Sequence, residues 1–212
     1  MCIRDRRSAE WFAARLGCVT ASRVKDVMAS GRGGAPSATR KNYMMELLCE
    51  RLTGQQSGPD LSSKPAVQRG VELEPFACMA YEADKGLMVI ETGLVMHPSI
   101  PGFGASPDGL VGEDGVLEIK CPNTATHIAT MQSERHDPQY EWQMLAQMAC
   151  TGRAWADFVS YDDRLPEPIQ YVCHRFERDF KRIREMEAEI KAFLEELGDL
   201  EKDMRERMKE AA

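Results

Sequence analysis

Two short stretches of the chain combine residue types that can do chemistry together. The first is residues 106–110, Ser-Pro-Asp-Gly-Leu, and the second begins ten residues after the aspartate, with Glu-Ile-Lys at 118–120. Mg²⁺ prefers oxygen ligands and keeps several waters, so one or two carboxylates and a substrate phosphate suffice to hold it. The bound metal lowers the pKa of a water and neutralises charge on the phosphate. Asp108, Glu118 and Lys120 therefore have the composition of a site that hydrolyses phosphodiesters.

The surrounding sequence predicts a β-hairpin that brings these groups together. Residues 109–112 and 115–120 have the pattern of two strands, and the Glu-Asp-Gly that joins them has turn chemistry. A hairpin of this length sets Asp108 level with the end of the second strand. Glu118 and Lys120 are two residues apart, so they project from the same face of that strand.

The residue types around this pair suggest further roles. Lys120 can orient or deprotonate the attacking water, and we expect a nearby cation and partial burial to lower its pKa. Ile119 points into the core, but its backbone carbonyl lies between the two side chains and is a candidate metal ligand. A Glu-x-Lys pair alone is common on surface hairpins. The Pro-Asp-Gly before it and the Cys-Pro after the lysine favour a site.

At these residues the chain resembles the PD-(D/E)xK nucleases, specifically the lambda exonuclease and YqaJ-type viral recombinase group. Three more blocks are similar to family signatures and follow the family's order: Trp11 with residues 15–22, residues 68–75 (Gly-x-x-x-Glu helix) and residues 140–143 (Tyr-x-x-Gln helix). The resemblance implies a restriction-endonuclease-like α/β fold, in which a mixed central sheet is flanked by helices and the site lies at one sheet edge.

The third carboxylate is expected in a predicted helix over residues 67–85. The resemblance makes Glu74 a carboxylate near the metal, and Glu72 is the competing candidate. Pro75 follows directly and predicts a helix start or kink beside Glu74.

A phosphate-binding group is expected near the amino terminus. A helix is predicted over residues 22–29, and Ser22 at its start is either a phosphate ligand or an N-terminal cap. Arg15 adds a bidentate phosphate donor. The resemblance implies that Arg15, Thr20 and Ser22 hold the 5′-phosphate of the strand being degraded.

Tyr140 and Gln143 lie one turn apart on one face of a predicted helix over residues 138–151. They either hold the lysine, the water or the scissile phosphate, or they simply pack. The resemblance implies a catalytic role for Gln143 and a DNA-binding role for Tyr140.

The composition is consistent with one domain. The chain has 212 residues, of which 43% are hydrophobic, and its seven cysteines include no Cys-x-x-Cys pair. The odd number argues against a disulfide framework, and the spacing against zinc or an iron–sulfur cluster, so a reducing cytosol is expected. No apolar run reaches the length of a membrane span. We expect a non-native or disordered leader at 1–7, the nuclease domain at 8–198 and a polar helical tail at 199–212.

The net charge of −7 argues against simple electrostatic binding of DNA. Charge is unevenly distributed, because residues 1–54 hold ten Lys and Arg against five Asp and Glu. A basic amino-terminal part that faces an acidic, metal-filled centre can still hold DNA.

Apolar periodicity predicts the remaining elements. Helices are expected over residues 8–15, 37–53, 124–132 and 176–197, the last ending at Gly198, and strands over 88–96, 155–161 and 169–174, with a turn over 98–103.

The resemblance implies a Mg²⁺-dependent 5′→3′ exonuclease that degrades linear duplex DNA to mononucleotides. Two Mg²⁺ ions are expected, or Mn²⁺ in their place. The remaining 3′ single strands would pass to a phage-type single-strand annealing protein in the cytoplasm of a bacterial host, and the enzyme would be a ring-shaped trimer. The alternatives are a structure-specific endonuclease of the same class and a non-catalytic recombination scaffold.

Overall fold

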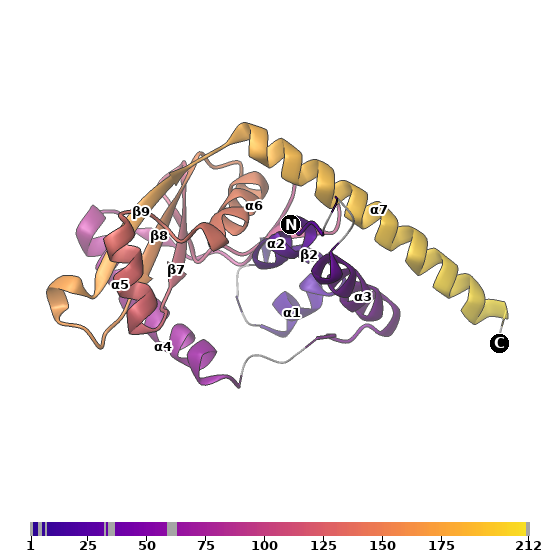
Figure 1. The fold of residues 1–212 in the computed structure, drawn as a ribbon, viewed down its shortest axis with the longest axis horizontal. Coiled ribbons are helices and arrows are strands. Elements are labelled where there is room, and N and C mark those ends of the chain that lie inside the picture. The colour runs from indigo at the N-terminus through magenta and orange to yellow at the C-terminus, as the bar shows by residue number, and fades with distance from the viewer. Residues whose placement is uncertain are drawn as a thin grey trace.

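A mixed five-stranded sheet is the frame of a computed structural model that describes residues 2–3, 6, 8–31, 33, 37–58 and 63–210 (Figure 1). Its strands in spatial order are β3 (Val89–Ile90), β6 (Gly109–Val111), β7 (Gly115–Lys120), β8 (Trp155–Tyr161) and β9 (Tyr171–Glu177). Strands β7 and β8 are parallel and the other neighbours are antiparallel. The predicted site therefore lies at the end of the central strand, not along an edge of the sheet as expected.

Strands β6 and β7 form the predicted hairpin. Their register pairs Val111 with Gly115, and Gly115 lies so close to the Trp155 ring that an added Cβ would come within 2.0 Å of it. A glycine is needed there because only its missing side chain leaves room for the ring. Arg153 ties the turn by donating from Nη1 to the carbonyl oxygens of Val111, Gly112 and Gly115 at 3.1, 2.9 and 2.7 Å.

A second sheet leads into the aspartate motif. Its order is β1 (Cys2–Ile3), β4 (Leu94–Met96), β5 (Phe103–Ala105) and β2 (Val19–Thr20). The strand predicted over residues 88–96 is divided, because β3 belongs to the first sheet and β4 to the second. Strand β5 begins where the predicted turn ends, and no strand is predicted there from the sequence.

Helices cover both faces of the five-stranded sheet. On one face α4 (Pro65–Lys85) packs Ala77 and Tyr81 against Leu117 and Ile119 of β7. On the other face α6 (Glu141–Thr151) covers Val116, in a core shared with α3 (Ala38–Thr53) and α7 (Phe180–Glu210). Helix α5 (Thr124–Ser133) lies beside β8. Alternate side chains of β7 thus face α4 and α6, and Ile119 points into the core as predicted.

Helix α4 continues through Pro75, so the predicted helix boundary there is wrong. Proline removes one hydrogen bond, the one to the carbonyl of Val71. The turn that follows is held by the burial of Ala77 and Tyr81, and packing of this kind outweighs local propensity. Glu74 consequently lies in the middle of a helix.

The amino-terminal elements match the prediction in part. Helix α1 (Ala9–Arg15) and α3 lie where expected, but the helix predicted over residues 22–29 is a 3₁₀ turn, η1 (Ala21–Arg23), followed by the short α2 (Val24–Val27). Val24 and Val27, three residues apart, are both buried, and this spacing of apolar residues is the reason why a helix is predicted there. Of the expected leader, residues 1, 4, 5 and 7 lie outside the described part, whereas 2–3 form β1.

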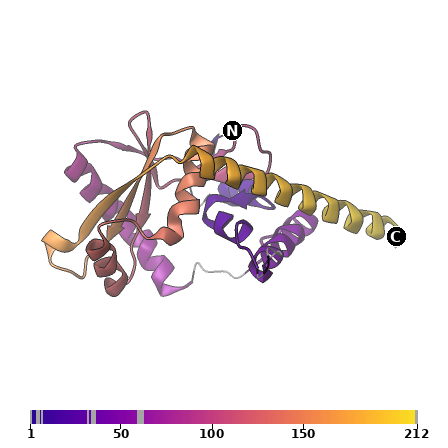
Figure 2. The same cartoon turned by 45° about the horizontal axis from the view of Figure 1, so that its top comes forward.

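Helix α7 runs for 31 residues through Gly198, so the end predicted there is wrong. A glycine inside a helix costs only about 1 kcal/mol, and Arg51 of α3 forms an ion pair with Glu201 beyond it, at 3.3 Å. Both views show the last turns of α7 projecting past the other elements (Figures 1 and 2). Across the described residues, α7 and the other helices all fall short of the length or apolarity that crossing a membrane requires.

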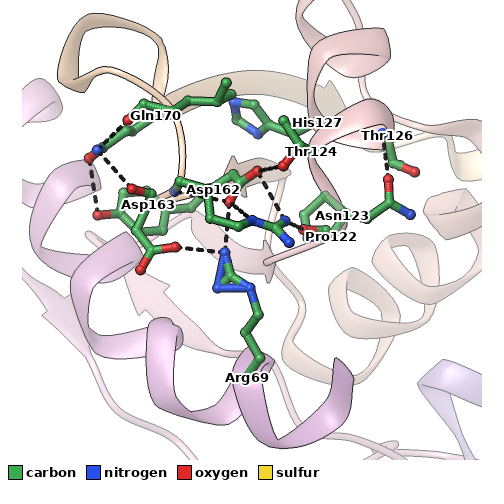
Figure 3. Close-up of polar contacts among 12 residues, drawn as sticks. Arg69, Pro122, Asn123, Thr124, Thr126, His127, Asp162, Asp163 and Gln170 are labelled. Atoms are coloured by element: carbon green, nitrogen blue, oxygen red, sulfur yellow. Dashed lines mark hydrogen bonds and ion pairs between the residues drawn. The ribbon is translucent and has the colours of Figure 1, made fainter. Parts of the chain in front are cut away.

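A buried carboxylate joins three segments near the end of β7 (Figure 3). Asp162, fully buried, accepts hydrogen bonds from Arg69 of α4 at 2.7 Å, from Thr124 of α5 at 2.6 Å and from Arg164 at 2.7 Å. Arg164 also donates to the carbonyl of Pro122, in the loop after β7, at 3.0 Å. Burial alone would raise the pKa of Asp162, but these donors outweigh it and hold the pKa well below its usual range.

Replacing Asp162 by Asn should lower the free energy of unfolding at pH 7 by about 2 kcal/mol, because charge-assisted hydrogen bonds to a buried carboxylate are lost. The folded pKa is depressed, so this stabilisation is complete above the pKa of an unfolded aspartate, about 3.9, and is lost as the pH falls towards the folded value. Thermal unfolding of both proteins between pH 7 and pH 3 should show a Tm difference that shrinks below about pH 4. A difference that stays constant with pH would contradict this assignment.

Candidate active site

Two carboxylates from different elements meet at the carboxyl end of β7. Glu74 comes from the middle of α4, and Asp108 from the turn between β5 and β6. The guanidinium of Arg6 lies between them, with Nη1 2.8 Å from Glu74 Oε1 and Nη2 2.7 Å from Asp108 Oδ1. Burial lowers the pKa of Arg6, but Asp108 and Glu74 outweigh burial and raise it. The competing candidate Glu72 is exposed on α4.

The hairpin fixes the orientation of Asp108. Its backbone N–H donates to the carbonyl of Leu117 at 3.0 Å, and its Oδ2 accepts from the N–H of Ile119 at 2.6 Å. This leaves Oδ1 directed at Arg6. The carbonyl of Ile119 is on the same edge of β7 as its N–H, because both groups of one strand residue point the same way. That carbonyl therefore faces the side where the two carboxylates meet.

Glu118 is a buried carboxylate, with 1% of its surface exposed. Its Oε1 accepts from Nε2 of Gln143 at 2.6 Å and forms an ion pair with Lys120, and its Oε2 accepts from Nε2 of Gln147 at 2.5 Å. Burial raises the pKa of Glu118, and Lys120 opposes this. Glu118 and Lys120 thus project from the same face of β7, as predicted, and α6 supplies the two amides that bind Glu118.

Lys120 differs from expectation in its pKa. Burial lowers that pKa, but the charges of Glu118 and Asp108 outweigh burial and raise it, whereas the sequence led us to expect a lowered value. Its Nζ lies 4.9 Å from the centre of the Tyr140 ring, which stacks on Phe158 at 5.5 Å. Tyr140 thus packs beside the lysine, and Gln143 binds the glutamate.

Several of these groups line a cavity of about 400 Å³. Its wall includes Arg6, Glu74, Asp108, Ile119, Lys120 and Tyr140. A second cavity of about 530 Å³ adjoins it and shares three of those residues, Arg6, Glu74 and Asp108. The substrate-sized space and the charged groups therefore coincide.

The donor set suits a hard cation. Among the described residues no three His, Cys, Asp or Glu side chains are gathered tightly enough to form a metal site, because Glu118 is turned to its amide partners. Glu74 and Asp108 nevertheless already share a cation, the guanidinium of Arg6. Carboxylate and carbonyl oxygens are the ligands that Mg²⁺ and Mn²⁺ prefer. The residues present therefore fit such a metal.

A second cationic group lies next to the aspartate motif. The guanidinium of Arg15 stacks on Trp11 at 3.9 Å, and its Nη1 lies 3.5 Å from the hydroxyl of Ser106. Trp11 donates to the same hydroxyl from Nε1 at 3.1 Å. Burial lowers the pKa of Arg15 to about 10. In the described part of the chain no carboxylate forms an ion pair with Arg15, so its charge is available to an anion.

The other residues expected at the phosphate site are placed differently. Thr20 is buried in β2, and its N–H donates to the hydroxyl of Tyr43 at 3.3 Å. Ser22 is exposed inside η1 and does not occupy the N-cap position, which belongs to Thr20. Of the two alternatives for Ser22, the N-terminal cap is therefore wrong, because the chain forms a 3₁₀ turn and not a helix that begins at Ser22.

Three residues of the site were not singled out from the sequence. Ser106 belongs to the aspartate motif, yet only the fold brings Trp11 and Arg15 to it. Gln147 follows Gln143 by four residues, a spacing that places both amides on one helix face and could have revealed it. Arg6 lies in the segment expected to be a leader.

The mixed sheet, the hairpin and the Asp108, Glu118 and Lys120 group at the end of β7 define a nuclease of the PD-(D/E)xK class. A profile of the YqaJ-like viral recombinase domain matches residues 10–154, and the chain belongs to this family. The family expected from the sequence motifs is thereby confirmed.

Solved structures give the same result. The chain is similar to an alkaline exonuclease, LHK-Exo, from Laribacter hongkongensis, with 54% sequence identity, a TM-score of 0.88, and 97% of this chain and 100% of that chain covered. The structure of LHK-Exo in complex with dAMP matches with the same values. A phage-related exonuclease from Haemophilus somnus 129PT shares the fold, at 16% identity and a TM-score of 0.73, over 88% of this chain and 96% of that chain. Among curated proteins no match is found.

Proposed function

We propose that the protein is a Mg²⁺-dependent 5′→3′ exonuclease that degrades linear duplex DNA to mononucleotides and leaves 3′ single strands. The observation that carries the proposal is the meeting of Glu74, Asp108 and Lys120 around one cavity at the end of β7, with the buried Glu118 paired to Lys120. The similarity to an alkaline exonuclease at 54% identity over nearly the whole chain supports it.

The carboxylates Asp108, Glu118 and Glu74 and the carbonyl of Ile119 would hold the metal, as two Mg²⁺ ions or as Mn²⁺. When bound, the metal activates water and neutralises charge on the scissile phosphate. Asp108 supports this role because Oδ2 is fixed by the N–H of Ile119 while Oδ1 faces a cation. Arg6 would have to leave these oxygens when the metal binds.

Lys120 would act as an ammonium at neutral pH, because Glu118 and Asp108 raise its pKa. In this form it donates hydrogen bonds, so it orients the attacking water and stabilises negative charge on the phosphate. Gln143 would exchange its bond to Glu118 for the water or the phosphate, and Tyr140 would keep the lysine in place against the DNA.

Replacing Lys120 by Ala should lower turnover by about 10²–10³-fold, the range found when a preorganised donor to developing negative charge is removed. Duplex binding should be nearly unchanged, because most affinity for DNA comes from contacts to other phosphates. Release of nucleotides from an end-labelled linear duplex, with a closed circle digested beside it, measures turnover. A filter-binding titration measures binding of the duplex. Lys191→Ala, an exposed change on α7, is the control.

Full turnover by the Lys120→Ala protein would remove Lys120 from the mechanism. Cleavage of the closed circle by the wild type would move the protein to the endonucleases, since an exonuclease needs an end. Binding without any cleavage would favour a recombination scaffold.

Arg15 and Ser106 would bind the 5′-phosphate of the strand being degraded, with Thr20 and Ser22, which are close to Arg15 in sequence. Arg15 supports this role because it is largely buried, has a lowered pKa and stacks on Trp11 without a carboxylate partner among the described residues. An anion would compensate its charge. Ser106 lies two residues before Asp108, so a phosphate bound here would set the distance to the metal ligands.

Arg15→Ala should slow digestion of 5′-phosphorylated ends by about 10–100-fold, the loss expected for one or two charge-assisted hydrogen bonds. Ends that carry a 5′-hydroxyl should be affected much less, because they have no phosphate to lose. Rates on the two substrates, measured side by side with Arg184→Ala as a surface control, give the comparison. Equal slowing of both would reject the phosphate role.

We further propose that copies of the chain associate as a ring-shaped trimer in the cytoplasm of a bacterial host, and that the 3′ strands pass to a single-strand annealing protein. Large apolar side chains on α4, on the edge strand β3 and at the residue before β3 support an interface between copies, since exposed apolar patches mark contact sites. They are Phe76, Met79, Met88 and Ile90, with 53%, 58%, 82% and 58% exposed. Sedimentation equilibrium should give three times the mass of one chain, and the mass of one chain would reject the ring.

A further inference from the structure

Gln147 is a polar side chain enclosed in the core beside the active site. None of its surface is exposed, and its Nε2 donates to Oε2 of Glu118 at 2.5 Å. Its own side-chain carbonyl, Oε1, is buried and has no hydrogen-bond partner among the described residues. A buried unpaired carbonyl reduces stability, so the hydrogen bond to Glu118 is kept at a cost.

The two oxygens of Glu118 lie in different surroundings. Oε1 accepts from Gln143 and pairs with Lys120, and both of these residues are partly exposed. Among the residues that the structure describes, Oε2 accepts a hydrogen bond from Gln147 alone, on the buried side of α6. A carboxylate can only accept, so the amide of Gln147 must present its NH₂ group to Glu118 and turn its carbonyl away.

Helix α6 holds Gln147 in place. The neighbouring Leu145, Ala146 and Met148 are fully buried, and the backbone carbonyl of Gln147 accepts from Thr151 at 2.8 Å. Water does not reach the contact to replace the amide. The bond from Gln147 to Glu118 is therefore shielded from solvent, whereas those from Gln143 and Lys120 lie where solvent or substrate can compete for them.

We infer that Gln147 is a positioning residue that anchors Oε2 of Glu118 and so presents Oε1 alone to a divalent cation. The inference rests on the metal-binding role proposed above for Glu118. Hydrogen bonds to the outer side of a metal ligand fix its orientation, and their loss typically weakens metal binding or activity 10–100-fold. Gln143 and Lys120 give way as the cation arrives, and Gln147 does not.

The test is Gln147→Met, which keeps the length of the side chain and removes its donor. Calorimetric titration with Mg²⁺ in the absence of DNA should show affinity about 10–100-fold weaker than that of the wild type. Nucleotide release should need correspondingly more Mg²⁺, while turnover at saturating Mg²⁺ recovers to within a few-fold. The Tm without metal should fall, because Oε2 of the buried Glu118 loses its donor, and the simultaneous loss of the unpaired carbonyl offsets only part of this effect.

Met148→Ala is the matched control, since it creates a cavity at the next buried position of α6. It should lower the Tm without changing the affinity for Mg²⁺. If Gln147→Met does not fold, Gln147→Asn, which keeps the amide but is one methylene shorter, should show the same weakening of metal binding. Unchanged Mg²⁺ affinity in a folded Gln147 variant, or an equal loss in Met148→Ala, would overturn the inference. Wild-type protein that binds Mg²⁺ but digests no DNA would refute the exonuclease proposal and leave the binding result intact.

Discussion

The buried carboxylate of Glu118 is the group on which the arrangement around β7 depends. A charge taken out of water is tolerated only when it is paired and hydrogen-bonded, and here Lys120, Gln143 and Gln147 meet that need. Two of these partners come from α6, so α6 has to lie across the end of β7. The chain leaves β7, passes through α5 and α6 and returns as the parallel strand β8, which sets the helix on that face.

Opposite charges lie close together in the wall of the cavity. Glu74 and Asp108 supply negative charge, and Arg6 compensates it. Arg15 contacts Ser106, which is joined to Asp108 through the buried Pro107. An acidic chain can therefore offer one place to a cation and a nearby place to a phosphate. The net charge of −7 describes neither place, because binding responds to local fields.

Local patterns predicted the parts of the site that lie close together in sequence. Turn residues and alternation gave the hairpin, with Asp108 level with the end of β7, and the motifs gave the family. Long-range effects caused the errors. Pro75 and Gly198 do not end their helices because packing and ion pairs hold the flanking turns. The pKa of Lys120 rises because the surrounding carboxylates outweigh burial, a balance that depends on distances in space.

The sequence by itself determined the chemistry available: a carboxylate before a hairpin, a glutamate and a lysine two residues apart on its second strand, and the family these define. Strand alternation and turn geometry act over a few residues, so spacing alone encodes them. Only the tertiary structure decided that Glu74 and not Glu72 shares Arg6 with Asp108, that Ser106 meets Arg15, and that Gln147 holds Glu118. The contacts of Ser106 and Gln147 join residues that are 91 and 29 positions apart in the sequence. Which of Glu72 and Glu74 faces the site depends on the rotation of α4 about its axis. Packing of helices on both faces of the sheet sets all of these contacts.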